Sequence, residues 1–205
     1  SILSGQKQTG VSLMLLVEKM DEGPLLGFGV HDIKDDTTAT HLTHDLIELS
    51  AGLLRDMLPS YITGEPMPET GTIITSRSQE ETCKLRGVPF APTYSRKLTK
   101  EDGRIDWSKP AEQIEREIRA YIEWPKSYTT FGDIEVIITQ AHAVPSNISE
   151  VAGEIEIQDD EAKLLMVNCK VGYLCIDTLK PAGKKEMSVK EFLSGYGSRL
   201  GKNSR

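Results

Sequence analysis

The alternation of apolar and polar positions predicts that the chain opens with two strands. Residues 9–17, TGVSLMLLV, are largely apolar on both alternating faces, which is typical of a strand buried on two sides in a parallel or mixed sheet. Gly23 and Pro24 interrupt this pattern, and a second strand-like run resumes at residues 25–28. The two runs predict a strand, a turn and a second strand.

A helix is predicted after the second strand. The side chains of residues 35–38 suit its N-terminus, and we expect Pro59 and Gly64 to end it. Its apolar positions recur at steps of three and four and share one face: Leu42, Leu46, Leu49, Leu53 and Met57. Strand, strand and helix form the trailing part of an α/β domain. Because these elements alone do not cover both faces of the first strand, we expect the chain to begin inside a domain.

The pattern changes after residue 62. Residues 63–100 are rich in Pro, Gly, Ser and Thr, and we interpret them as a linker without regular structure. Pro110 suits the first turn of a helix whose inner face carries Ala111, Ile114, Ile118 and Ile122. Five short strand-like runs with polar turns follow, and they favour a small closed or nearly closed barrel. They cover residues 128–131, 134–144, 153–157, 164–169 and 173–179.

The chain is predicted to end in a short helix. Ser188 and Glu191 have the spacing of a capping box, and Gly195 is expected to stop the helix. The predicted fold class is therefore a partial Rossmann-like α/β domain followed by an OB-like β-barrel. The predicted boundaries are residues 1–62 for the α/β part, 63–100 for the linker and 101–205 for the barrel.

Composition and charge limit the compartment and the partners that we expect for this chain. The chain has 205 residues, a net charge of −7 and 38% hydrophobic residues, which is enough for a packed core. It contains no apolar run of the roughly 18 residues that a membrane span needs, so we expect no membrane partner. The 3 cysteines are an odd number, which argues against a disulfide framework and for a reducing, cytoplasm-like compartment. Positive charge gathers at the end, where residues 180–205 hold 7 Lys or Arg and 2 Asp or Glu.

Few motifs point to chemistry on their own. The sequence has no Gly-rich phosphate loop and no pair of cysteines at CxxC spacing. His41 and His44 share a face of the predicted helix, but no third ligand follows at the spacing of a zinc motif, which favours surface histidines.

Asp21 is the candidate acid–base residue. It follows the first predicted strand, where α/β sheets bind ligands, and precedes Gly23, which would allow the backbone to approach a ligand. Taken alone, Asp-x-Gly is more typical of an ordinary turn than of a catalytic site.

Residues 9–26, TGVSLMLLVEKMDEGPLL, resemble the folate-dependent formyltransferase family, whose pattern pairs Thr-Gly-Val with a later Asp-x-Gly. In that family the Asp is catalytic: it places and deprotonates the attacking amine. The resemblance implies this role for Asp21, and it makes Gly23 the turn glycine at the substrate site.

A second resemblance identifies the branch. Residues 94–107, YSRKLTKEDGRIDW, the Trp124-Pro125 pair and residues 183–188, GKKEMS, are similar to the linker and barrel of methionyl-tRNA formyltransferases. Sugar-nucleotide formyltransferases and formyltetrahydrofolate dehydrogenases carry related barrels and remain competitors. The third alternative is a non-catalytic tRNA-binding or interaction module.

The resemblance implies transfer of a formyl group from 10-formyltetrahydrofolate, a co-substrate, to the methionine amine of initiator methionyl-tRNA, without a metal. The setting would be cytoplasmic, or the matrix of a mitochondrion or plastid. The family's Asn-x-His pair and its Ser-Leu-Leu-Pro folate loop are missing from these 205 residues. We therefore expect the chain to lack the N-terminal catalytic half and to be inactive alone.

Basic residues in the linker and barrel are candidates for contact with tRNA phosphates, which supply salt-dependent affinity. The alternative is a solvated basic surface. The candidates are Arg96, Lys97, Lys100, Lys184 and Lys185.

Overall fold

The computed structural model describes residues 1–88, 90–91, 94–146, 151–158 and 163–200. The chain separates into two compact units, which are described one at a time. The first unit comprises residue 1 and residues 6–35 and 41–96, and the second comprises residues 2–5, 36–40 and 97–205.

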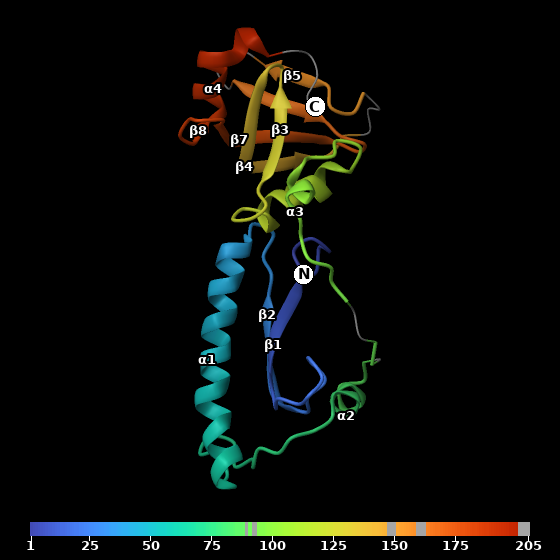
Figure 1. Ribbon diagram of the computed structural model, residues 1–205, viewed down its shortest axis with the longest axis vertical. Helices are drawn as coiled ribbons and strands as arrows, with labels where there is room; N and C mark the ends of the chain where they lie inside the picture. Colours follow the sequence, from blue (N-terminus) through green and yellow to red (C-terminus); the bar gives the residue numbers. More distant parts are fainter. Residues whose placement is uncertain (89, 92–93, 147–150, 159–162, 201–205) are drawn as a thin grey trace. The chain divides into compact units, whose positions relative to one another are not determined.

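The first unit is a β-hairpin with a long helix along it (Figure 1). Strand β1 (Gln8–Met14) pairs antiparallel with β2 (Leu25–Asp32). Helix α1 (Ala39–Thr63) approaches the hairpin where β2 carries glycines: a Cβ at residue 27 would overlap Met57, and a Cβ at residue 29 would press on Leu49. The predicted inner face of the helix therefore contacts the sheet.

Strand β1 is not buried on two sides, contrary to the expectation from its apolar pattern. Its residues alternate between exposed and half-buried, and none is fully buried. In the part of the chain that the structure describes, β1 pairs with β2 alone. The far face of β2 is also open, since Phe28 is 37% exposed and Val30 is 47% exposed.

Of the two residues expected to end helix α1, Gly64 does so and Pro59 does not. Pro59 lies inside the helix, and the chain leaves the helix at Gly64, which has a φ of 73°. The N–H of Gly64 donates to the carbonyl of Ser60 at 3.0 Å. Pro59 costs the helix one hydrogen bond, but only one turn follows it.

Residues 63–100 contain regular structure, which differs from the interpretation of this segment as an unstructured linker. Helix α2 (Gln79–Leu85) begins at Ser78, whose side chain accepts a hydrogen bond from the N–H of Glu81. Arg77 pairs with Leu25 through two backbone hydrogen bonds of 2.7 and 2.9 Å. This part of the chain therefore folds back onto β2. The domain boundaries at residues 62 and 100 stay a prediction.

The second unit is a β-sheet with helices packed against it (Figure 1). Its helices are α3 (Ala111–Ala120) and α4 (Val189–Tyr196), with short 3₁₀ turns at Lys100–Gly103 and Gly197–Arg199. The strands are β3 (Ser127–Phe131), β4 (Ile134–Val144), β5 (Ile155–Gln158), β6 (Leu164–Asn168), β7 (Tyr173–Pro181) and β8 (Met187–Ser188).

The sheet has the order β3-β4-β7-β6-β5, with β8 added beside β7 and every pairing antiparallel. Among the described residues no pairing joins β5 to β3, so the sheet is open and corresponds to the nearly closed form of the prediction. The predicted turns at residues 145–150 and 158–161 lie partly outside the described residues. The fold class is thus an α/β segment followed by an OB-like β domain.

Alternating positions of the strands form one core with the inner face of α3. Phe131, Ile138, Leu174 and Phe192 are fully buried there, together with Ile114. The predicted capping box is confirmed, since Ser188 accepts from the N–H of Glu191 and the Glu191 carboxylate accepts from the N–H of Ser188. Gly195 does not stop the helix, which continues to Tyr196.

Two short N-terminal segments belong to the second unit. The side chain of Gln113 on α3 donates to the carbonyl of Leu3 at 3.2 Å, and that of Arg119 donates to the carbonyl of Thr37 at 2.7 Å. Arg119 also pairs with Glu115, and both side chains are mostly buried rather than facing solvent as an outer-face ion pair would. The helix face next to the core therefore holds these segments.

Candidate functional site

The candidate acid–base residue lies in the connection between β1 and β2. Residues 15–24 form this loop, which the N–H of Leu15 closes by donating to the carbonyl of Pro24 at 3.0 Å. Asp21 is exposed and has a φ of 59°, in the left-handed region that Asp tolerates better than most side chains. Its carboxylate therefore projects from a loop at the end of a strand, as the sequence predicts.

Gly23 is buried two residues later, against the other end of the same loop. A Cβ at this position would overlap the carbonyl oxygen of Leu15. The close approach that requires glycine is thus an approach to the chain's own backbone. A role for Gly23 in binding substrate stays a proposal.

Gln79 is a site residue that the sequence interpretation missed. Its side-chain amide donates to the carbonyl of Asp21 at 2.6 Å and to that of Gly23 at 3.1 Å. The residue was hidden because it lies in the segment interpreted as a linker. The Ser-x-x-Glu capping pattern at residues 78–81 was the available signal for a helix there.

A basic groove is present in the second unit. It has a volume of about 440 Å³, and its lining includes Lys100, Lys126 and Lys180 together with Tyr128. Glu101 and Glu135 also line it, so the groove is mixed in charge with an excess of lysine. Of the residues predicted to contact tRNA, Lys100 lines the groove, and Lys126 and Lys180 line it as well.

Four basic candidates remain, and they differ in their relation to this groove. Gly183 lines it, and Lys184 and Lys185 follow directly, both exposed in the turn between β7 and β8. Lys97, also exposed, begins the second unit. Arg96 is exposed too but ends the first unit, so it is not grouped with the groove.

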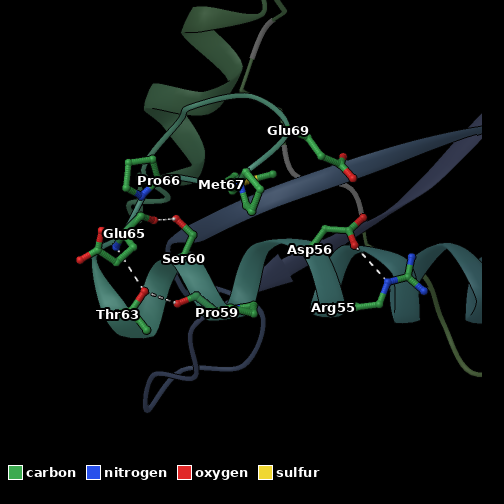
Figure 2. A pocket seen from close by; sticks show the side chains of 10 residues that line it. Arg55, Asp56, Pro59, Ser60, Thr63, Glu65, Pro66, Met67 and Glu69 are labelled. Carbon is green, nitrogen blue, oxygen red and sulfur yellow. Dashed lines mark hydrogen bonds and ion pairs between the residues drawn. The ribbon is translucent and has the colours of Figure 1, made fainter.

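A second cavity lies in the first unit, at the C-terminal end of α1 (Figure 2). The buried hydroxyl of Ser60 donates to the carbonyl of Glu65 at 2.7 Å and accepts from the N–H of Ile74 at 3.1 Å. Arg55 and Asp56 pair at the rim, at 3.1 Å. Both hydrogen bonds hold the turn after the helix, so the Ser60 hydroxyl has a structural role there.

The two buried cysteines, Cys169 and Cys175, are core residues. Burial raises the pKa of the Cys169 thiol to about 12, and burial together with the charge of Asp177 raises the pKa of the Cys175 thiol. Both are therefore protonated thiols at neutral pH. Over the described residues, no three His, Cys, Asp or Glu side chains are placed to hold a metal ion. Within the same residues, no helix is long and apolar enough to cross a membrane.

Residues 97–197 match the family described as formyl transferase, C-terminal domain. The match covers 101 of the 205 residues, so the second unit carries the C-terminal domain of a formyltransferase. The whole chain is similar to the methionyl-tRNA formyltransferase of Pseudoalteromonas translucida. The two are 33% identical over 210 residues, which cover 100% of this chain and 60% of the relative. The chain thus spans about 60% of the length of this relative and corresponds to its C-terminal part.

Two solved structures share the fold. HypX from Aquifex aeolicus, in complex with tetrahydrofolic acid, has a TM-score of 0.60 at 14% identity, covering 97% of this chain and 32% of HypX. An N-formyltransferase from Helicobacter canadensis, in complex with folinic acid and dTDP-3-aminofucose, has a TM-score of 0.55 at 16% identity. That match covers 91% of this chain and 58% of the enzyme. At these identities the likeness concerns the fold alone.

Proposed function

We propose that this chain serves the transfer of a formyl group from 10-formyltetrahydrofolate to the methionine amine of initiator methionyl-tRNA. The observation that carries the proposal is the exposed Asp21 on the loop after β1, in a chain similar over its whole length to methionyl-tRNA formyltransferases.

Asp21 is the proposed acid–base residue. The methionine amine attacks the formyl carbon, a new C–N bond forms, and the Asp21 carboxylate takes the proton that the amine loses. The bond between the formyl carbon and the folate nitrogen then breaks, and the proton that Asp21 took passes to that nitrogen, which returns Asp21 to its carboxylate form. A positioned carboxylate contributes roughly 10²–10⁴-fold to such a step.

Asp21 does not complete the reaction by itself. The developing charge on the formyl oxygen needs hydrogen-bond donors, and in this family an Asn-x-His pair supplies them. The 205 residues contain no Asn-x-His sequence. Because the loss of one such donor costs roughly 10²–10³-fold, we propose that the chain alone is inactive.

The groove in the second unit is the proposed contact for tRNA phosphates. It gathers Lys100, Lys126 and Lys180, and Lys184 and Lys185 extend the basic surface beside it. Tyr128 in the lining offers a ring for stacking as well as packing. Lys97 and Arg96 lie just before the groove in sequence and complete the proposed set.

The alternative acceptor is the amine of a sugar nucleotide, and the fold shared with the Helicobacter canadensis enzyme favours keeping it. The complete product of this gene should be assayed with 10-formyltetrahydrofolate against methionyl initiator tRNA and against a dTDP-amino sugar. The proposal expects formylation of the tRNA and none of the sugar. Formylation of the sugar alone would establish the alternative.

A further inference from the structure

We infer that Gln79 is the positioning residue for Asp21. It holds the loop of residues 15–24 and thereby keeps the Asp21 carboxylate in one position. The inference rests on the proposed function of Asp21. Gln79 donates to two carbonyls of this loop, that of Asp21 at 2.6 Å and that of Gly23 at 3.1 Å.

The loop needs such support because its own contacts are few. Besides the closing Leu15–Pro24 hydrogen bond, the loop holds an exposed ion pair between Lys19 and Glu22 at 3.3 Å. Its apolar side chains face solvent: Leu16 is 93% exposed and Met20 is 88% exposed. Asp21 itself is exposed and in the left-handed region. The place of its carboxylate is therefore set through the backbone, and the two carbonyls bound by Gln79 belong to the peptide units that join Asp21 to Glu22 and Gly23 to Pro24.

Three contacts of neighbouring residues hold the segment that carries Gln79 in place. Arg77, two residues earlier, pairs with Leu25 through two backbone hydrogen bonds. Ser78 caps helix α2, with the N–H of Glu81 at 3.1 Å from its hydroxyl oxygen. At the other end of the helix, the Arg86 guanidinium lies 4.2 Å from the centre of the Phe28 ring on β2. Contacts with β2, the strand that follows the loop, thus hold the Gln79 amide in position to bind the loop.

Glutamine suits this task better than chemically similar side chains do. The side-chain amide carries two N–H donors and no charge, and both partners here are acceptors. A glutamate of the same shape would place carboxylate oxygens against two carbonyl oxygens. This isosteric change therefore separates donor chemistry from packing.

The first test measures amide hydrogen exchange of the Leu15 N–H, whose hydrogen bond to the Pro24 carbonyl closes the loop, in the 205-residue chain. Gln79→Glu and Gln79→Ala should accelerate this exchange by about tenfold or more, the factor that corresponds to about 1.4 kcal/mol. Glu80→Gln, on the next residue of α2, is the matched control and should leave the loop unchanged. Gln79→Lys restores a donor and should recover part of the protection. Leu15 exchange that is the same in Gln79→Glu and in the unchanged protein would overturn the inference.

The second test separates positioning from stability in the complete gene product. Gln79→Glu should lower kcat for formyl transfer by about 10–100-fold, because small misplacements of a reacting group cost up to about 10². The KM values for folate and tRNA should stay within about threefold. Arg86→Ala, which loosens α2 without touching the amide, should affect kcat much less. A loosened loop with unchanged kcat would overturn the positioning role. Absence of formyl transfer in the unchanged gene product would instead overturn the proposed function, and the exchange result would still decide whether Gln79 holds the loop.

Discussion

Gly23 lies against Leu15, close enough that a Cβ on residue 23 would overlap the Leu15 carbonyl oxygen. Gly23→Ala therefore has to displace one end of the loop between β1 and β2. We expect a loss of stability of the first unit of about 1–3 kcal/mol, the usual cost of overpacking. Urea denaturation followed by circular dichroism measures it. Gly52→Ala on α1, where a Cβ meets the Arg55 side chain at an ordinary 3.9 Å, is the control and should be neutral or stabilising. Equal stabilities of the two variants would contradict the packing of the loop.

The basic groove is expected to determine tRNA affinity. Reversing Lys184 and Lys185 to Glu should weaken binding of initiator tRNA. It should also reduce the slope of log K against log salt by about 0.7–0.9 for each phosphate that the protein no longer neutralises. Gel shifts at several salt concentrations give this slope. Lys170→Glu, exposed on the turn between β6 and β7, serves as a control for charge reversal elsewhere in the second unit, and Lys184→Glu alone is the charge-matched comparison. An unchanged slope would exclude the turn between β7 and β8 and direct attention to Lys126 and Lys180 inside the groove.

Three carboxylates of the second unit should make its stability fall in acid. Hydrogen bonding from Arg199 lowers the pKa of Asp133, and hydrogen bonding from Ser188 lowers the pKa of Glu191. Ser108 likewise lowers the pKa of Asp106. Groups with a lowered folded-state pKa add stability above their unfolded values, here 3.8 for Asp and 4.5 for Glu, and lose it as pH falls through the folded value.

Thermal unfolding followed by the fluorescence of the buried Trp107 should thus show a Tm that falls as the pH drops below about 4.5. The double variant Asp133→Asn, Glu191→Gln should show a shallower fall. A Tm that falls equally in both proteins would mean that neither the Asp133–Arg199 pair nor the Glu191–Ser188 pair makes the stability depend measurably on pH.

The two units should differ in resistance to proteases. The largest fully buried side chains, such as Phe131 and Phe192, all lie in the second unit, whereas β1 has no buried residue. Tyr94 is 95% exposed, and Arg96 and Lys97 beside it are exposed trypsin sites. Brief trypsin treatment should therefore trim the chain toward residues 95–100 and leave a resistant C-terminal fragment. A stable fragment that retains β1 and β2 would contradict this expectation.

The sequence predicted the second unit well because its signals are local. Strand β4 has the bounds that its alternating pattern indicates, and the capping box of Ser188 and Glu191 is present. The errors are non-local. The apolar pattern of β1 indicates that both faces of the strand are suited to apolar contacts. It does not indicate whether the residues that would make those contacts are among the described ones. Gln79 was missed because its two acceptors lie more than fifty residues earlier, at sequence separations of 58 and 56.

The basic groove shows the same limit. Lys100, Lys126 and Lys180 come from a 3₁₀ turn, the approach to β3 and the end of β7, and only the fold brings them together. The distribution of charge along the chain identified the basic end at Lys184 and Lys185, where the residues are neighbours in sequence. Lysines distributed among three elements leave no such pattern.

Asp21→Asn in the complete gene product tests the central claim most directly, with initial rates of formyl transfer from 10-formyltetrahydrofolate to methionyl initiator tRNA. Glu22→Gln, the neighbouring carboxylate of the same loop, which pairs with Lys19, is the matched control. The account predicts that Asp21→Asn lowers the rate by roughly 10²–10⁴-fold while Glu22→Gln stays close to the unchanged protein. A rate for Asp21→Asn within about threefold of the unchanged protein, far less than an acid–base residue contributes, would show that Asp21 is a turn residue and contradict the account.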